Sequence, residues 1–104
     1  MIQLVKVNNN YDILLDNKKV GYINILSNTF NMIEIFIEEN YRGNGYGSDS
    51  FKLFLDELKN NNINNLIITI QVDNIPMLRI INHYKCIIKK KNDKLITYEI
   101  INVI

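Results

Sequence analysis

Apolar and polar residues alternate through the first forty positions of the chain, which predicts an antiparallel meander of β-strands. Short polar runs, typical of turns, separate the apolar segments. We expect strands at Ile2–Val7, Tyr11–Leu15, Val20–Leu26 and Phe30–Glu38, with turns at Asp16–Lys19 and Ser27–Thr29. In the last of these strands Glu34 and Phe36 share one face with Met32, and three isoleucines share the other.

The second half of the chain combines helical and strand patterns. Apolar residues recur three and four positions apart after the glycine-rich segment Tyr41–Gly47, as in an amphipathic helix. The nearly continuous apolar run that follows is typical of a strand buried on both faces. Pro76 suits the first turn of a second helix. We therefore expect a helix at Ser48–Lys59, a strand at Leu66–Val72, a helix capped by Asp73 or Asn74, and strands at Cys86–Lys90 and Leu95–Val103.

This order of elements, ββββ-α-β-α-ββ, predicts an α+β fold with two main helices. No linker or internal repeat interrupts the chain, so we expect residues 1–104 to form one domain. A chain of 104 residues can bury roughly 60–68% of its unfolded surface, which is enough for one hydrophobic core.

Composition and charge exclude several classes of protein. The chain has 12 basic against 11 acidic residues, so we expect no nucleic-acid partner held by general attraction to phosphate. No apolar run approaches the roughly 18 residues of a membrane span, and the first residues do not resemble a signal peptide. Cys86 is the one cysteine, so it supplies neither an internal disulfide nor a metal cluster. These features favour a cytoplasmic protein with no metal and no membrane partner.

The segment Arg42–Gly47 carries the strongest chemical signal in the sequence. Its pattern, Arg-x-x-Gly-x-Gly, lies between a predicted strand and a predicted helix. Glycines let successive backbone N–H groups curve inward, and the start of a helix adds positive potential, so the arrangement suits a pyrophosphate. Ser48 can cap the helix or donate to a phosphate oxygen. The alternative interpretation is a glycine-rich turn that only reverses the chain.

The segments Arg42–Ser48 and Asn74–Ile80, with the elements around them, resemble the GNAT superfamily of N-acetyltransferases. The resemblance covers about residues 20–104 and implies a mixed, mostly antiparallel GNAT-like sheet that opens to hold acetyl-CoA. In that family the glycine-rich turn binds the pyrophosphate of acetyl-CoA, and the preceding strand and the helix-opening asparagine contact its pantetheine arm. The family's backbone donor for the oxyanion maps onto Phe36 or Ile37. The cofactor-binding residues implied here are Phe36, Ile37, Arg42, Gly43, Asn44, Gly45, Tyr46, Gly47, Ser48 and Asn74.

The resemblance also implies a reaction, in which an amine attacks the thioester of acetyl-CoA. An amine at neutral pH is mostly protonated, so a base must take its proton. Glu34 is our candidate base, because a carboxylate partly removed from water inside an apolar strand accepts a proton more readily. The alternative is that its face of the strand is exposed to solvent. Glu38 and Glu39 are weaker candidates, and Gln71 could orient a water molecule.

Tyr84, near the end of the second predicted helix, is our candidate for the acid that protonates the departing thiolate. Many family members place a tyrosine seven residues after the asparagine, where this chain has Ile81. They also place a Gly-Phe pair where this chain has Lys85–Cys86. We interpret His83 as a polar helix-end residue and Cys86 as a small apolar side chain packed in the core.

The acceptor is expected to be an exposed protein amine, either a lysine side chain or an N-terminus. Family members usually carry two helices that wall the acceptor site, whereas this chain shows only strands and tight turns between Ile2 and Phe30. The run Asn-x-x-Met-Leu-Arg is also similar to that of the family's protein-lysine acetyltransferases. Two alternatives stay open: acetylation of a small amine such as a polyamine or an antibiotic, and a catalytically inactive module that binds coenzyme A. The Ile-rich strand Leu95–Val103 could also pair across a homodimer.

Overall fold

Seven strands form one sheet, with two helices against it, in the computed structural model, which describes residues 1–26 and 32–101. The strands are β1 (Ile2–Val7), β2 (Asn10–Leu15), β3 (Lys18–Ile25), β4 (Met32–Ile37), β5 (Asn65–Gln71), β6 (Cys86–Lys91) and β7 (Leu95–Ile101). The helices are α1 (Tyr46–Asn60) and α2 (Ile75–Ile81), and a 3₁₀ turn, η1 (Glu39–Tyr41), precedes α1. This order confirms the predicted α+β fold. The predicted turn Ser27–Thr29 and the predicted strand ends at Phe30 and Val103 lie outside the described residues.

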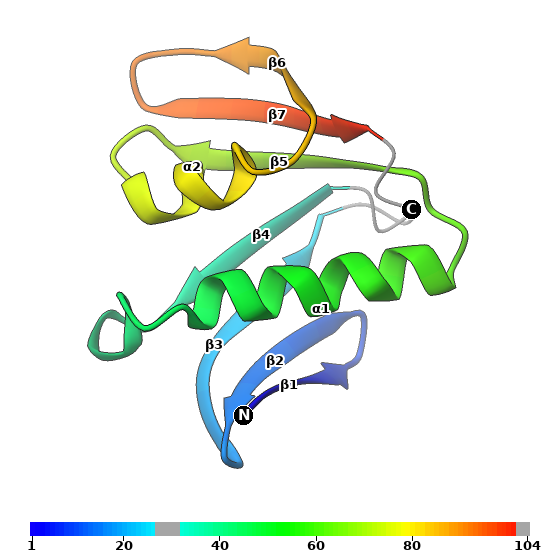
Figure 1. The fold of residues 1–104 in the computed structure, drawn as a ribbon, viewed down its shortest axis with the longest axis vertical. Coiled ribbons are helices and arrows are strands. Elements are labelled where there is room, and N and C mark those ends of the chain that lie inside the picture. The colour runs from blue at the N-terminus through cyan, green and yellow to red at the C-terminus, as the bar shows by residue number, and fades with distance from the viewer. Residues whose placement is uncertain (27–31, 102–104) are drawn as a thin grey trace.

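The strand order is β1-β2-β3-β4-β5-β7-β6, and every neighbouring pair is antiparallel except β4 and β5. These two strands run parallel because α1 carries the chain back along the sheet between them. They pair only at Met32 with Ile67 and at Ile33 with Ile68, and their carboxyl halves then separate (Figure 1). The predicted mixed, mostly antiparallel sheet is therefore confirmed, and it opens between β4 and β5.

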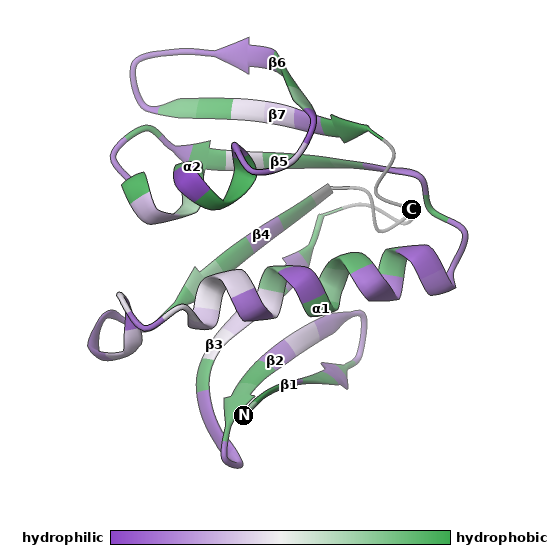
Figure 2. Ribbon diagram, in the orientation of Figure 1, coloured by the Kyte–Doolittle hydropathy of each residue, from purple (hydrophilic) through white to green (hydrophobic). Residues whose placement is uncertain are grey.

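Both helices pack on one face of the sheet and enclose the hydrophobic core (Figure 1). Hydrophobic and hydrophilic residues fall on different sides of α1 (Figure 2), and its buried side includes Phe51 and Phe54. The sheet contributes alternate residues such as Ile13, Ile23 and Ile33, each no more than 1% exposed. No helix in the described part of the chain is long and apolar enough to cross a membrane.

The opposite face of the sheet, which we call the open face, carries no helix among the described residues (Figure 1). In β5, Leu66 and Ile68 are buried under the helices, whereas Ile67 and Thr69 on the open face are half-buried and Gln71 is exposed. The predicted burial of this strand on both faces is therefore wrong. The apolar run instead reflects β-branched residues, which side chains of neighbouring strands shield in part.

β7 lies inside the sheet, between β5 and β6. Its residue Ile101 pairs with Asn65 on one side, and Ile100 pairs with Cys86 on the other. The prediction that Leu95–Val103 offers an edge for a homodimer is therefore wrong over the described part of that strand, because both of its edges are used. The edges of the sheet are β1 and β6, and β6 ends in three lysines, which disfavour pairing with another strand.

A bulge in β3 sets the position of β4. The register between β2 and β3 skips Val20. The carbonyl oxygen of Val20 accepts the backbone N–H of Glu38 at 2.8 Å, just beyond the end of β4. Gly21, the next residue, faces Ile37, and a Cβ there would overlap the carbonyl oxygen of Phe36. Glycine is therefore required for the close approach of β3 to the end of β4, where the sheet opens.

Replacing Gly21 tests this constraint. Gly21→Ala should lower the free energy of unfolding by about 1–3 kcal/mol, because a methyl group must displace backbone rather than a flexible side chain. Gly47→Ala is the matched control, since its Cβ would meet Ile80 at 3.6 Å and Ile37 at 3.7 Å, which is ordinary contact. The control should be neutral or up to about 1 kcal/mol more stable, as expected for alanine in a helix. Urea denaturation measures both, and equal stabilities of the two variants would contradict the constraint.

Candidate functional site

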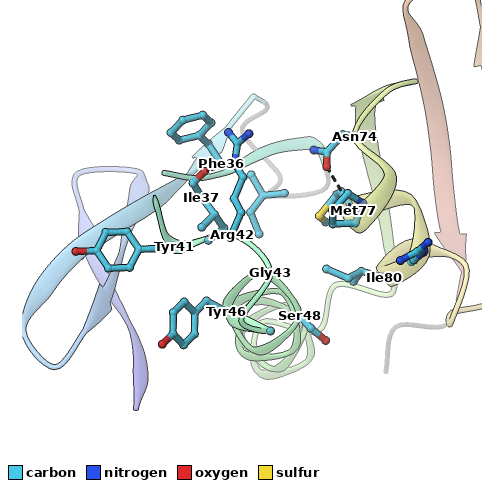
Figure 3. Close-up of a pocket in the computed structure, with 15 residues that line it drawn as sticks. Phe36, Ile37, Tyr41, Arg42, Gly43, Tyr46, Ser48, Asn74, Met77 and Ile80 are labelled. Atoms are coloured by element: carbon cyan, nitrogen blue, oxygen red, sulfur yellow. Dashed lines mark hydrogen bonds between the residues drawn. The ribbon is translucent and has the colours of Figure 1, made fainter. Parts of the chain in front are cut away.

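A cleft of about 330 Å³ lies where β4 and β5 separate (Figure 3). The carboxyl half of β4 forms one wall, α2 forms the other, and the glycine-rich turn leads below them into α1 (Figure 3). All residues predicted to bind the cofactor line this cleft except Asn44; those present are Phe36, Ile37, Arg42, Gly43, Gly45, Tyr46, Gly47, Ser48 and Asn74. The fold therefore brings Asn74, just before α2, to the same cleft as the glycine-rich turn and the first residues of α1.

Asn44 supports the glycine-rich turn and does not line the cleft. Its side-chain nitrogen donates to the carbonyl oxygen of Tyr41 at 3.3 Å and to that of Arg42 at 3.4 Å. Both acceptors belong to the turn itself, so the amide holds the local backbone in place. The contact of Asn44 with the cofactor stays a prediction, and the hydrogen bonds show that its side chain supports the turn.

The turn and the first residues of α1 form an anion cradle. Gly43 and Gly45 have φ angles of +82° and +80°, a left-handed conformation that favours glycine. The first hydrogen bond of the helix runs from the N–H of Asp49 to the carbonyl of Gly45 at 3.0 Å. The N–H groups of Tyr46–Ser48 precede this bond and have no acceptor within the helix. Unpaired donors at the positive end of a helix of 15 residues are suited to phosphate oxygens.

Arg42 is fixed along the end of β4 by two contacts. Its Nε donates to the carbonyl oxygen of Ile37 at 2.8 Å, and its guanidinium lies 5.2 Å from the centre of the Phe36 ring (Figure 3). Phe36 in turn stacks on Tyr22, with ring centres 5.2 Å apart. The positive charge of the Arg42 guanidinium is therefore held at the edge of the cleft.

The backbone of β4 presents unpaired groups to the cleft. Along an antiparallel pair, successive residues point their N–H and C=O groups alternately toward and away from the partner strand. The hydrogen bond from the N–H of Glu38 to the carbonyl of Val20 shows which residues of β4 face β3. Phe36, two residues earlier, therefore directs its backbone groups to β3. Ile35 and Ile37 direct theirs to the opening. The predicted oxyanion donor is therefore not the N–H of Phe36, and Ile37 is the better of the two candidates. Ile35 supplies a second N–H on the same edge.

A second hollow, of about 350 Å³, lies on the open face and meets the cleft at the opening of the sheet. The two hollows share four lining residues: Ile35, Phe36, Asn74 and Met77. Glu34 and Gln71 line the second hollow from β4 and β5. The structure thus places the candidate base beside the cleft, but Glu34 is exposed, so the predicted partial removal of its carboxylate from water is wrong.

Tyr84 lies away from both hollows. Its ring packs edge-on against Phe51 of α1, with centres 5.5 Å apart. Burial, and secondarily the charge of Asp56, raise the pKa of Tyr84. The geometry therefore gives no support to Tyr84 as the acid. His83 is exposed, and Cys86 packs partly buried against the core.

α2 supplies wall residues that the sequence interpretation did not assign to the site, namely Pro76, Met77, Arg79 and Ile80. The side chain of Asn74 caps this helix by accepting the N–H of Met77 at 3.3 Å, as expected for a capping residue (Figure 3). Arg79 adds a second arginine to the lining of the cleft. One signal in the sequence could have pointed to Arg79. Arginine is rare in this chain, and Arg42 and Arg79 are its only two.

Comparison with known proteins gives a family and a fold. The model of the acetyltransferase (GNAT) family matches residues 6–86. No curated protein sequence matches the chain. Among solved structures, RimL, a ribosomal α-N-protein acetyltransferase, superposes with a TM-score of 0.72 at 18% identity, covering 88% of this chain and 59% of that one.

Two further structures agree with this fold. A GNAT-family acetyltransferase from Streptococcus pneumoniae has a TM-score of 0.70 at 18% identity, covering 92% of this chain and 68% of that one. A GNAT-family acetyltransferase from Elizabethkingia anophelis, with acetyl-CoA bound, has a TM-score of 0.70 at 16% identity, covering 88% and 74%. Because the superposition with RimL covers 59% of that protein, this chain spans less than two thirds of its length.

Replacing Tyr84 by phenylalanine tests its assignment to the core. Because the folded protein raises the pKa of Tyr84, the neutral phenol favours folding. This contribution is fully present below the unfolded pKa of about 10 and is lost as pH rises through the higher folded pKa. Tyr84→Phe should therefore lessen the fall in unfolding free energy above about pH 10, measured by urea denaturation at pH 8 and at pH 11. An equally steep fall in the variant would contradict the assignment.

Proposed function

Because this chain belongs to the acetyltransferase (GNAT) family, we propose that it transfers the acetyl group of acetyl-CoA to a primary amine of a protein, a lysine side chain or an N-terminus. The observation that carries the proposal is the opening between β4 and β5, which joins an anion cradle to a hollow on the open face. Two similar structures support it, one an acetyltransferase with acetyl-CoA bound and one a ribosomal α-N-protein acetyltransferase.

The cleft fits the parts of acetyl-CoA that a protein must hold. The amides of Tyr46–Ser48 would bind pyrophosphate oxygens, and the arginines Arg42 and Arg79 balance its negative charge. The carbonyl oxygen of Ile35, on the open edge of β4, suits an amide N–H of the pantetheine arm, which would lie against β4 as an added strand does.

The reaction forms a C–N bond and breaks the C–S bond of the thioester. Glu34 accepts the proton of the attacking amine through a water molecule, which Gln71 orients across the hollow. The N–H groups of Ile37 and Ile35 stabilise the negative charge that develops on the acetyl oxygen. A thiol has a pKa of about 8.5, so the departing thiolate can take its proton from water. No side-chain acid is then required, which agrees with the position of Tyr84 outside the lining of the cleft.

A protein amine fits the acceptor side better than a small molecule. The second hollow opens onto a bare sheet face, and no helix among residues 1–26 closes over it. A small amine would need walls on several sides to be held against water. A lysine or an N-terminus brings binding energy from the segment that carries it.

Thermal unfolding with acetyl-CoA tests the cofactor site. Ligand at about 100 times its dissociation constant adds about 2.7 kcal/mol, which for a domain of this size raises Tm by roughly 10–20 °C. The double variant Arg42→Ala, Gly45→Glu should lose this rise, because it removes a cation and places a carboxylate in the cradle. Lys52→Ala, an exposed change on α1, is the control and should keep it. If acetyl-CoA does not raise Tm of the wild-type protein, the assignment of the cleft as the cofactor site is wrong.

Glu34→Gln tests the base. The variant should lower kcat at least about 10²-fold, because the amide cannot accept the proton, while acetyl-CoA raises Tm as in the wild type. Glu39→Gln, a change in η1 outside both hollows, is the matched control and should keep its activity. The assay follows release of free thiol with a peptide library as acceptor. Unchanged turnover would exclude Glu34 as the base, and acetyl-CoA binding without any turnover in the wild type would favour an inactive binding module.

A further inference from the structure

Positive charge is concentrated on one hairpin of the sheet. Residues 85–94, which include β6 and the turn to β7, hold five of the ten lysines and one carboxylate, Asp93. The whole chain has a net charge of +1, so the rest of it is net negative. A surface of this kind attracts anionic partners from solution.

A bulge turns two successive lysines of this hairpin to the open face. The register pairs Ile88 with Tyr98 and Lys90 with Thr97, and it skips Lys89. Residues directly opposite each other share a face, and Thr97 belongs to the open face, so Lys90 lies there too. Lys89 reaches the same face, because its Nζ lies 3.5 Å from Glu99. In a regular strand the two lysines would point to opposite faces.

A row of side chains connects these lysines to the second hollow. The hydroxyl groups of Thr97 in β7 and Thr69 in β5 are hydrogen-bonded at 2.9 Å, and Thr69 lines the hollow. Lys90 therefore lies two strand spacings from Thr69, or about 10 Å. Leu95, the first residue of β7, lines the hollow as well. An extended peptide covers about 10 Å in three residues.

We propose that the acceptor amine is carried on an acidic segment, whose carboxylates lie about three to five residues from the amine and bind the lysines of the β6–β7 hairpin. This inference rests on the proposed transferase function. The amine would enter the hollow beside Glu34, and Lys90 would meet the carboxylates farther along the open face. A small amine reaches only the hollow, so this surface selects for a polypeptide.

Protection of the sheet edge is the rival explanation. β6 is an edge strand, and lysines and bulges are common means of preventing edge pairing. Edge protection requires charge on the strand, but it does not require neighbouring lysines on the face that holds the hollow. The two explanations differ in whether an acidic peptide binds.

Fluorescence anisotropy of labelled peptides, with coenzyme A present, tests the proposal. The probe has one lysine, with glutamates three to five residues away on either side, and its matched partner has glutamines there. The acidic peptide should bind about tenfold more tightly at low salt, and the difference should shrink as salt rises. Lys90→Glu should abolish the difference, whereas Lys52→Glu, the same charge change on α1, should keep it. Tm of each variant checks folding, and Lys90→Gln, which should reduce the difference, replaces Lys90→Glu if that variant does not fold.

The outcomes separate this inference from the function on which it rests. Equal binding of the two peptides, or an equal loss in the Lys52→Glu control, overturns the inference and leaves edge protection as the role of the lysines. Acetyl transfer to both peptides at equal kcat/KM also overturns it, while the transferase function stands. Tighter binding of the glutamate peptide without acetyl transfer to either peptide contradicts the transferase function. The hairpin then remains a surface that binds acidic peptides.

Discussion

The site depends on one constraint, the limited pairing of β4 with β5. Two parallel strands that meet at only two residue pairs leave the backbone groups that face each other in their carboxyl halves without a strand partner. Buried backbone groups are costly unless something pairs with them, so such an opening is stable only where water or a ligand can enter. The cleft, the second hollow and the unpaired N–H groups of Ile35 and Ile37 all follow from this separation.

Much of the fold could be predicted because its signals are local. The alternation in the first four strands, the helical spacing in α1 and the capping asparagine Asn74 each depend on residues close together in the sequence. The cradle is local as well, since the glycines and the first turn of α1 are adjacent. These features needed no knowledge of which strands become neighbours.

The remaining expectations failed where they depended on the order and register of distant strands. β7 inserts between β5 and β6, so a strand near the end of the chain became internal, and β5 kept one open face. The direction of the N–H of Phe36 depends on the alternation of the β3–β4 ladder, which a bulge near Gly21 helps to set. Tyr84 has a ring that packs well on Phe51, and nothing in the local sequence distinguishes that partner from the cleft.

The single helical layer has a thermodynamic consequence. Half of the side chains in each central strand face solvent or strand neighbours, so unfolding exposes less new apolar surface than in a sheet covered on both faces. The heat capacity of unfolding depends chiefly on that surface, and it should fall below the usual value of about 12–15 cal/mol/K per residue. The curve of stability against temperature is then flatter, so the fold changes little in stability between cold and warm conditions.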